Sequence, residues 1–133
     1  MKILLLGKHG QLGVDLCRTL SQNTSLHLTA LGRDECNVLH TQSIQALHSF
    51  DFDLLINCVA YTNVDHAESD TASAFQVNAF AVGELAKVCE NKHAKFIHFS
   101  TDYVFGHLHN RQPLVETDTP SPINIYGLSL IHI

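Results

Sequence analysis

Three glycines follow the first apolar run of the chain at three-residue intervals. The run Ile3–Leu6 is wholly apolar and leads into Gly7, with Gly10 and Gly13 in the segment GKHGQLG. The run predicts a strand buried on both faces, and helical spacing of leucines begins at Gln11. In a strand–turn–helix of this kind, the glycines make a tight turn, let the backbone approach a pyrophosphate, and pack helix against strand. N–H groups at the helix start attract phosphates. The segment therefore predicts a dinucleotide site.

The rest of the chain repeats the alternation of strand and helix. Segments 26–31, 53–60 and 95–100 predict strands, while 44–47 and 71–91 predict helices. The apolar face of the long helix is predicted to comprise Ala72, Phe75, Ala79, Val82, Leu85 and Cys89. This order predicts an α/β fold with a Rossmann-like, doubly wound parallel sheet. About four strands are present, fewer than in the usual two βαβαβ halves, so the sheet is expected to be truncated.

Composition excludes several classes of protein. The 133 residues suit one domain at most, and the net charge of −5 with eight Lys and Arg predicts binding neither to nucleic acid nor to an anionic membrane. The four cysteines form no Cys-x-x-Cys pair, which argues against a disulfide framework or a zinc site. MKILLL is too short for a signal peptide, so we expect a cytoplasmic protein. His107 and His109 are interpreted as solvated loop residues, and no metal ligand is assigned.

A candidate catalytic pair stands further along the chain. In FSTDYVF, Thr101 lies at the end of the last predicted strand, where ligands of α/β sheets bind. Tyr126 follows and opens a Tyr-x-x-x-Lys pattern, except that position 130 is Leu. A tyrosine there would protonate a carbonyl oxygen as hydride arrives, and a lysine at i+4 would lower its pKa from about 10. The alternative is an ordinary loop tyrosine.

The choice of cofactor depends on the end of the second predicted strand. Arg33 stands where many nicotinamide enzymes carry an acid that holds the ribose hydroxyl. An arginine there can take a 2′-phosphate instead, so NADPH is favoured over NADH. The alternative is a solvated loop charge.

Residues 1–127 resemble the dTDP-4-dehydrorhamnose reductases, a family of extended short-chain reductases. The resemblance is carried by MKILLLGKHGQLG, NCVAYTNVDHAESD, NAFAVGELAKVC, FIHFSTDYVF and ETDTPSPINIYG. It implies that the pyrophosphate of the cofactor is contacted by Gly10, Gln11 and Leu12, and its adenine by Asn37 and Val38. The segment after the third strand, Ala60, Tyr61 and Thr62, would line the cofactor. The sugar would be contacted by Thr101 and Asp102, and the proton donor would be Tyr126.

The resemblance also implies an activity. These enzymes use NAD(P)H to reduce the 4-keto group of dTDP-4-dehydro-6-deoxy-L-mannose to dTDP-L-rhamnose for cell-surface polysaccharide. The related dehydratases read Thr-Asp-Glu at the strand end, whereas this chain reads Thr-Asp-Tyr, which favours a reductase. Two alternatives stay open: a non-catalytic dinucleotide-binding regulatory subunit of the methionine adenosyltransferase type, and a reductase or epimerase of another nucleotide sugar. A homodimer of the parent protein stays open as well. A Mg²⁺ ion, which some family members hold near the position of Asp15, is not assigned here.

The last six residues, LSLIHI, match nothing in the family. They are the translation of CTG TCT CTT ATA CAC ATC, the start of a transposon-end adapter used in sequencing libraries. We therefore expect 1–127 to be a partial NAD(P)-binding Rossmann domain without its C-terminal substrate domain, and 128–133 to be a non-native tail. The chain is expected to be inactive by itself. The competing explanation is a degenerate gene that has lost its lysine.

Overall fold

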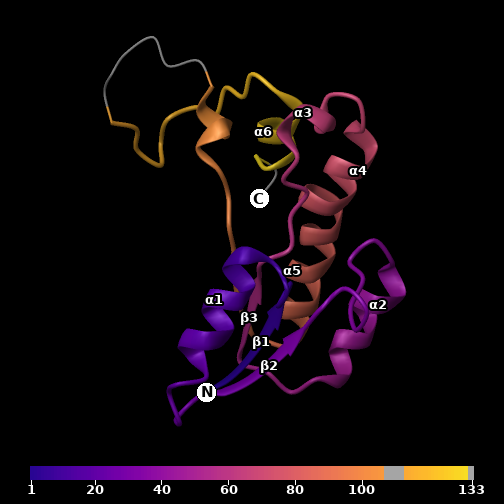
Figure 1. The fold of residues 1–133 in the computed structure, drawn as a ribbon, viewed down its shortest axis with the longest axis vertical. Helices are drawn as coiled ribbons and strands as arrows, with labels where there is room; N and C mark the ends of the chain where they lie inside the picture. The colour runs from indigo at the N-terminus through magenta and orange to yellow at the C-terminus, as the bar shows by residue number, and fades with distance from the viewer. Residues whose placement is uncertain (107–112, 132–133) are drawn as a thin grey trace.

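The computed structural model describes residues 1–106 and 113–131. His107 and His109 lie outside the described residues. Within these ranges, four parallel strands form one sheet in the order β2-β1-β3-β4 (Figure 1). They are β1 (Lys2–Leu6), β2 (His27–Leu31), β3 (Leu54–Asn57) and β4 (Lys95–His98). The predicted α/β, Rossmann-like fold is confirmed.

Helices cover both faces of the sheet. The helix α1 (Gln11–Leu20) lies on one face. On the other lie α2 (Thr41–Gln45), the 3₁₀ turn Ala46–Ser49, and a continuous rod made of α4 (Thr71–Phe75), a π-helical turn (Gln76–Phe80) and α5 (Ala81–Asn91). Three short elements lie beyond the carboxyl ends of the strands: α3 (Val64–Ala67), the 3₁₀ turn Asp102–Phe105, and α6 (Ile125–Ser129) (Figure 1).

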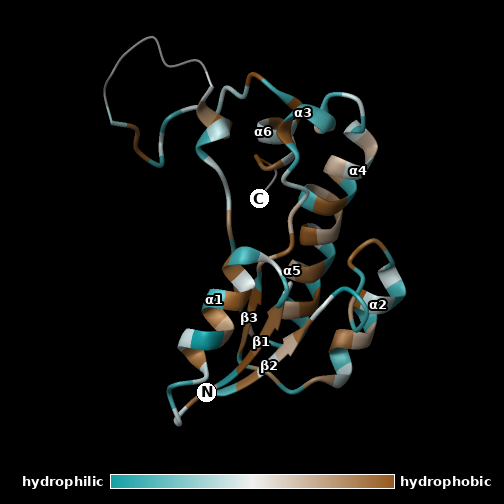
Figure 2. Cartoon of the chain, in the orientation of Figure 1, coloured by the Kyte–Doolittle hydropathy of each residue, from teal (hydrophilic) through white to brown (hydrophobic). Residues whose placement is uncertain are grey.

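The central strand β1 is buried on both faces, as its apolar run predicts. Its last four residues are at most 2% exposed, because one face packs on α1 and the other on α2 and α5. Figure 2 shows the hydrophobic strands in the middle of the molecule, with polar residues alternating along the outer sides of the helices. The edge strand β4 is less covered, since Ile97 is 43% exposed and Phe99, just past the strand, is 41% exposed.

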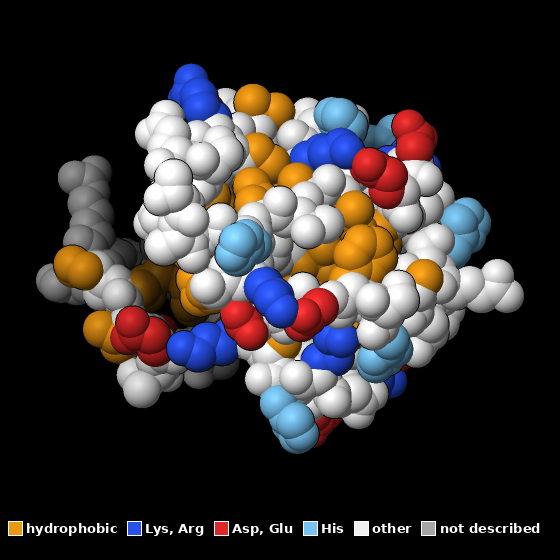
Figure 3. Space-filling view, turned by 90° about the horizontal axis from the view of Figure 1, so that it is seen from below, with side chains coloured by type: hydrophobic (Ala, Val, Ile, Leu, Met, Phe, Trp, Pro, Cys, Tyr) orange, Lys and Arg blue, Asp and Glu red, His pale blue; other side chains and the backbone are white. Residues whose placement is uncertain are grey.

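The amino ends of the strands are tied together by charge. The ammonium of Lys2 pairs with Asp51, and the Lys2 amide donates to the Asp53 carboxylate at 2.7 Å. Figure 3 views this end of the molecule and shows cationic and anionic side chains interspersed on it. The glycine turn and the hydroxyl residues predicted from sequence belong to the opposite, carboxyl end of the sheet.

Two strand boundaries and one helical face differ from the sequence expectations. The strand predicted over 53–60 ends at Asn57, whose side chain accepts the Val59 amide at 3.0 Å and turns the backbone out of the ladder. The strand predicted over 95–100 ends at His98. In the long helix, Ala74 and Asn78 are buried in place of Ala72 and Ala79. The predicted face was wrong in its first half because a buried asparagine reads as a surface residue.

The segment 128–133 contributes to packing where it is described. Ser129 closes α6 and is fully buried, and Leu130 is 2% exposed. Residues 132–133 lie outside the described residues. The non-native origin of this segment stays a prediction.

Candidate cofactor and active site

The glycine turn has the backbone geometry that its sequence predicts. Gly7 ends β1 with a φ of +87°, a conformation that residues with a side chain rarely adopt. Gly13, in the first turns of α1, lies against the Gly7 carbonyl, and a Cβ at Gly13 would overlap the Gly7 oxygen. The helix can therefore approach the turn this closely only with glycine at 13. Gly10 caps α1 in extended backbone, and a Cβ there would meet only the Gly7 carbonyl oxygen, at 3.4 Å, which is ordinary van der Waals contact.

A cavity of about 470 Å³ opens at this turn. It lies where the sheet reverses its order, because β2 and β3 flank β1 on opposite sides. Ligands of open α/β sheets bind at such a switch point, outside the carboxyl ends of the strands. The cavity is lined by residues that follow β1, β2 and β3 and by two from the long helix: Gly7, His9, Gly10, Gly32, Arg33, Cys36, Asn37, Val38, Leu39, Cys58, Val59, Ala60, Tyr61, Ser73 and Val77.

Most of the predicted cofactor residues meet at this cavity. The structure brings together Gly7, Gly10, Arg33, Asn37, Val38, Ala60 and Tyr61 in its lining. Gln11 and Leu12 are exposed in the first turn of α1, Gly13 supports the turn from behind, and Thr62 is exposed beyond Tyr61. None of these four belongs to the lining. Among the lining residues that were not predicted, Gly32 could have been found from the sequence, because it directly follows the strand predicted over 26–31, just as Gly7 follows the first strand.

Of the cationic side chains Lys8 and Arg33 around the cavity, Lys8 is paired with a carboxylate and Arg33 is not, among the described residues. Lys8 pairs with Glu35 at 2.7 Å, and the same carboxylate accepts the Gly32 amide at 2.6 Å. The Lys8 hydrogen bond, followed by the Gly32 amide, lowers the pKa of Glu35. Arg33 is exposed and takes part in no ion pair within the part of the chain that the structure describes. Its charge is therefore available at the cavity, whereas the Lys8 charge is neutralised.

Asn37 presents its amide group at the cavity in a defined orientation. Its side-chain oxygen accepts the Leu39 amide at 3.1 Å, an Asx-type turn. This hydrogen bond fixes the side chain of a residue that lines the cavity.

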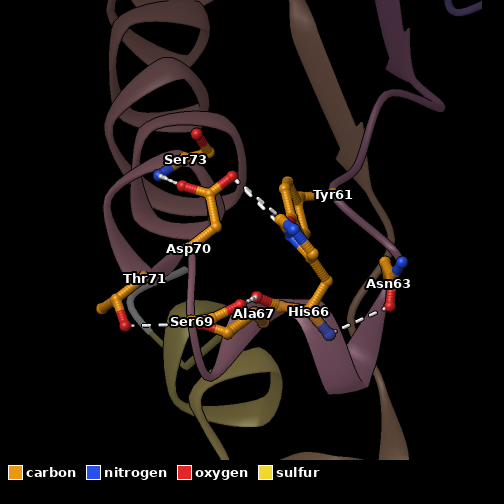
Figure 4. A network of polar contacts seen from close by, with 8 residues as sticks. All are labelled: Tyr61, Asn63, His66, Ala67, Ser69, Asp70, Thr71 and Ser73. Carbon is orange, nitrogen blue, oxygen red and sulfur yellow. Dashed lines mark hydrogen bonds and ion pairs between the residues drawn. The ribbon is translucent and has the colours of Figure 1, made fainter.

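A polar network fixes the cavity rim at Tyr61 (Figure 4). The Tyr61 hydroxyl contacts His66 Nδ1 at 2.5 Å and donates to the Asp70 carboxylate at 3.4 Å. Burial, and then the Asp70 charge, raise the pKa of Tyr61. Asp70 also caps α4 through the Ser73 amide, and its hydrogen bonds to Ser73 are the main cause that lowers its pKa. The rim is therefore anchored to the start of the long helix.

A buried amide joins the rim to α6. Asn78, in the π-helical turn, accepts the Tyr61 amide at 2.8 Å and donates to the Tyr61 carbonyl at 3.1 Å. It also donates to the Ser129 hydroxyl at 2.9 Å, and that hydroxyl donates to the Tyr126 carbonyl at 2.7 Å. The Asn78 side chain therefore holds both the cavity rim at Tyr61 and the helix α6, which carries Tyr126. Sequence reasoning did not assign Asn78.

The predicted catalytic residues lie on two elements in contact with each other: Tyr126 on α6, and Thr101 at the start of the 3₁₀ turn. The rings of Tyr126 and Tyr103 meet edge to face with centroids 5.6 Å apart, and Gly127 packs on the Tyr103 carbonyl. Thr101 accepts the Tyr103 amide at 3.3 Å and donates to Asp102 at 3.2 Å. Tyr126 does not line the cavity; it is joined to the lining through Ser129, Asn78 and Tyr61.

No metal centre is apparent in the described part of the chain. Residues 1–106 and 113–131 hold no group of three His, Cys, Asp or Glu side chains placed to bind an ion. Asp15 pairs instead with Arg18 on the exposed side of α1, at 2.9 Å. None of the described helices is both long and apolar enough to cross a membrane.

Comparison with known proteins identifies the family. The sequence model described as RmlD substrate binding domain matches residues 1–132. The chain belongs to this family. Among relatives of the RmlD family, the dTDP-4-dehydrorhamnose reductase of Burkholderia thailandensis is 40% identical over 97% of this chain and 43% of its own length. The Escherichia coli K12 enzyme of that name is 37% identical over 96% of this chain and 43% of its own. The resemblance seen in the sequence is confirmed.

Solved structures of RmlD-family proteins agree with this fold. A dTDP-4-dehydrorhamnose reductase from Clostridium acetobutylicum superposes with a TM-score of 0.92 at 27% identity, covering 99% of this chain and 47% of that one. The Bacillus anthracis enzyme, solved with NADP, gives 0.87 at 30% identity, covering 98% and 46%. The chain thus spans less than half the length of these relatives.

Proposed function

We propose that this chain is the cofactor-binding part of an NAD(P)H-dependent dTDP-4-dehydrorhamnose reductase. The observation that carries the proposal is the glycine turn at the sheet's switch point, opening on a cavity that seven of the predicted cofactor residues line. The family membership and the NADP complex of a relative support the same assignment. A bound cofactor would supply hydride to the keto carbon of a dTDP-linked deoxysugar.

The residues present suit such a cofactor. The helix α1 begins at the glycine turn, and the free amides of its first turn would attract a diphosphate. Arg33 carries an unpaired charge for a 2′-phosphate, which favours NADPH over NADH. Asn37 and Val38 would hold the adenine end, and Ala60, Tyr61 and Thr62 would extend along the cofactor towards α6.

The catalytic roles follow from the chemistry of the hydroxyl groups. Tyr126 would give its phenolic proton to the keto oxygen of the sugar, and the Thr101 hydroxyl would orient that oxygen. Asp102 would contact the sugar. The phenol needs a nearby cation to lower its pKa, and Leu130 provides none. We therefore expect this chain to bind cofactor without turning over substrate.

Calorimetric titration of the 133-residue chain with NADPH tests the cofactor assignment. Gly10→Asp is the informative variant, because Gly10 has extended backbone that any residue adopts and aspartate is a preferred helix N-cap. The fold is thus retained while a negative charge faces the diphosphate. We expect binding to the parent chain and its loss in Gly10→Asp. Gly83→Asp, on the exposed side of α5, is the matched control and should bind normally.

Activity is tested in a chimera. Residues 1–127 are joined to the remaining part of the Burkholderia thailandensis reductase, and ketosugar-dependent NADPH oxidation is measured beside the native relative. We expect turnover that Tyr126→Phe abolishes. A folded chimera that binds NADPH but never oxidises it would support the regulatory subunit instead and refute the proposal.

A further inference from the structure

The first amide of α6 is held by a side chain from a distant segment. The Ile125 amide donates to the Glu68 carboxylate at 2.8 Å, across 57 positions of sequence. Amides in the first turn of a helix have no partner within it, so each needs an outside acceptor. The Asn124 side chain supplies one for the Gly127 amide at 2.7 Å, and Glu68 supplies one for the Ile125 amide. Ile125 directly precedes Tyr126, so a shift of this amide also moves the phenol.

Glu68 is itself fixed by the rim of the cofactor cavity. It directly follows α3, whose first turn is capped by the Asn63 side chain through the His66 amide at 3.0 Å. The His66 ring in turn contacts the Tyr61 hydroxyl at the rim. The elements α3 and α6 lie side by side beyond the strand ends (Figure 1). A short path of contacts therefore runs from the cavity rim through α3 and Glu68 to the backbone beside Tyr126.

We propose that Glu68 is a positioning residue for Tyr126, an inference that rests on the proposed function. Glu68 does not line the cavity, and it acts on Tyr126 through the Ile125 amide. Its carboxylate fixes where α6 begins and so fixes the direction of the phenol relative to the cofactor rim. The alternative is that the exposed hydrogen bond between Glu68 and the Ile125 amide has no effect on the position of Tyr126.

The test uses the 133-residue chain labelled with 3-fluorotyrosine. Its three tyrosines, Tyr61, Tyr103 and Tyr126, give three fluorine signals, which single Tyr→Phe variants assign. Glu68→Ala removes the acceptor, and Glu68→Gln keeps an oxygen that can still accept the Ile125 amide. Glu84→Ala is the control, because Glu84 pairs with Lys87 on α5, away from α6.

In Glu68→Ala the Tyr126 signal should move towards that of free fluorotyrosine while the Tyr61 signal stays in place. Hydrogen exchange at the Ile125 amide should accelerate by about fivefold, the effect of losing one hydrogen bond. Glu68→Gln should restore both, and Glu84→Ala should change neither. Unchanged Tyr126 and Ile125 signals in Glu68→Ala, or equal loss in Glu68→Gln, would overturn the proposal.

NADPH binding is measured on the same samples to separate this inference from the proposed function. We expect all three variants to bind NADPH as the parent chain does, since neither glutamate lines the cavity. Failure of the parent chain to bind would count against the proposed function. Normal binding with an unmoved Tyr126 signal in Glu68→Ala would count against Glu68 alone.

Discussion

Two glycines in helices give opposite predictions for the same substitution. Gly13 lies against the Gly7 carbonyl, so the Cβ of Gly13→Ala would overlap backbone that cannot rotate away. At Gly83, in α5, no atom lies within 4 Å of the position that a Cβ would take. At Gly13 the helix α1 must approach the turn closely, whereas at Gly83 the helix α5 faces open space.

The magnitudes follow from overpacking and helix propensity. A clash of this kind costs about 1–3 kcal/mol, and more where the obstacle is backbone. Alanine regains up to about 1 kcal/mol of helix propensity at either site. Gly83→Ala should therefore stabilise the chain by about 0.5–1 kcal/mol. Gly13→Ala meets backbone and should destabilise the chain by about 2 kcal/mol or more.

Urea denaturation followed by circular dichroism measures both effects. The midpoint should fall in Gly13→Ala and rise in Gly83→Ala, with the dependence on urea unchanged in each. NADPH affinity should fall in Gly13→Ala, because the turn is pushed out of shape, and should be unaffected in Gly83→Ala. Equal stability changes in the two variants would refute the claim that α1 is packed on the turn through Gly13.

Three further predictions concern single side chains. Arg33→Ala should weaken NADPH binding by about tenfold to a hundredfold, the value of a charge-assisted contact, and leave NADH binding unchanged in calorimetry; equal losses would exclude a 2′-phosphate site. Asn78→Ala should cost about 2–4 kcal/mol in urea denaturation, because it leaves a cavity at a fully buried position and takes the partner from the part-buried Tyr61 amide and carbonyl, whereas exposed Asn91→Ala should cost under about 0.5 kcal/mol. Burial lowers the pKa of His98, so its neutral form stabilises the fold above the unfolded value of about 6.5, and this contribution is lost as pH falls through the folded value. The loss of stability on acidification should be smaller in His98→Gln than in the parent chain; identical pH profiles would contradict this.

The order of elements could be predicted from the sequence because buried strands and glycine turns leave local patterns. The run Ile3–Leu6 and the turn at Gly7 are read directly, and both are confirmed. Boundaries were harder, since the end of β3 depends on the Asn57 side chain accepting a backbone amide two residues on. The face of the long helix was misread because Asn78 is buried, and burial of an amide depends on partners that lie far away in sequence.

The site was predictable where a family motif is local and not where partners are distant. The turn and the strand ends carry residue types that predict a dinucleotide site, and they meet at one cavity. The attachments of α6 to Glu68 and Asn78 span 57 and 51 positions and have no local pattern. Neither could be inferred before the strands and helices were placed in space.

The most direct test of the account is to map NADPH on the chain by amide chemical shifts. A titration of the isotope-labelled protein should move the amides of Gly10, Gln11 and Leu12 together with those of Arg33 and Tyr61, because the diphosphate lies at the turn and the nucleotide extends along the cavity. Shifts confined to other surfaces, such as the outer side of α5, would contradict the central claim, as would no shifts at saturating NADPH.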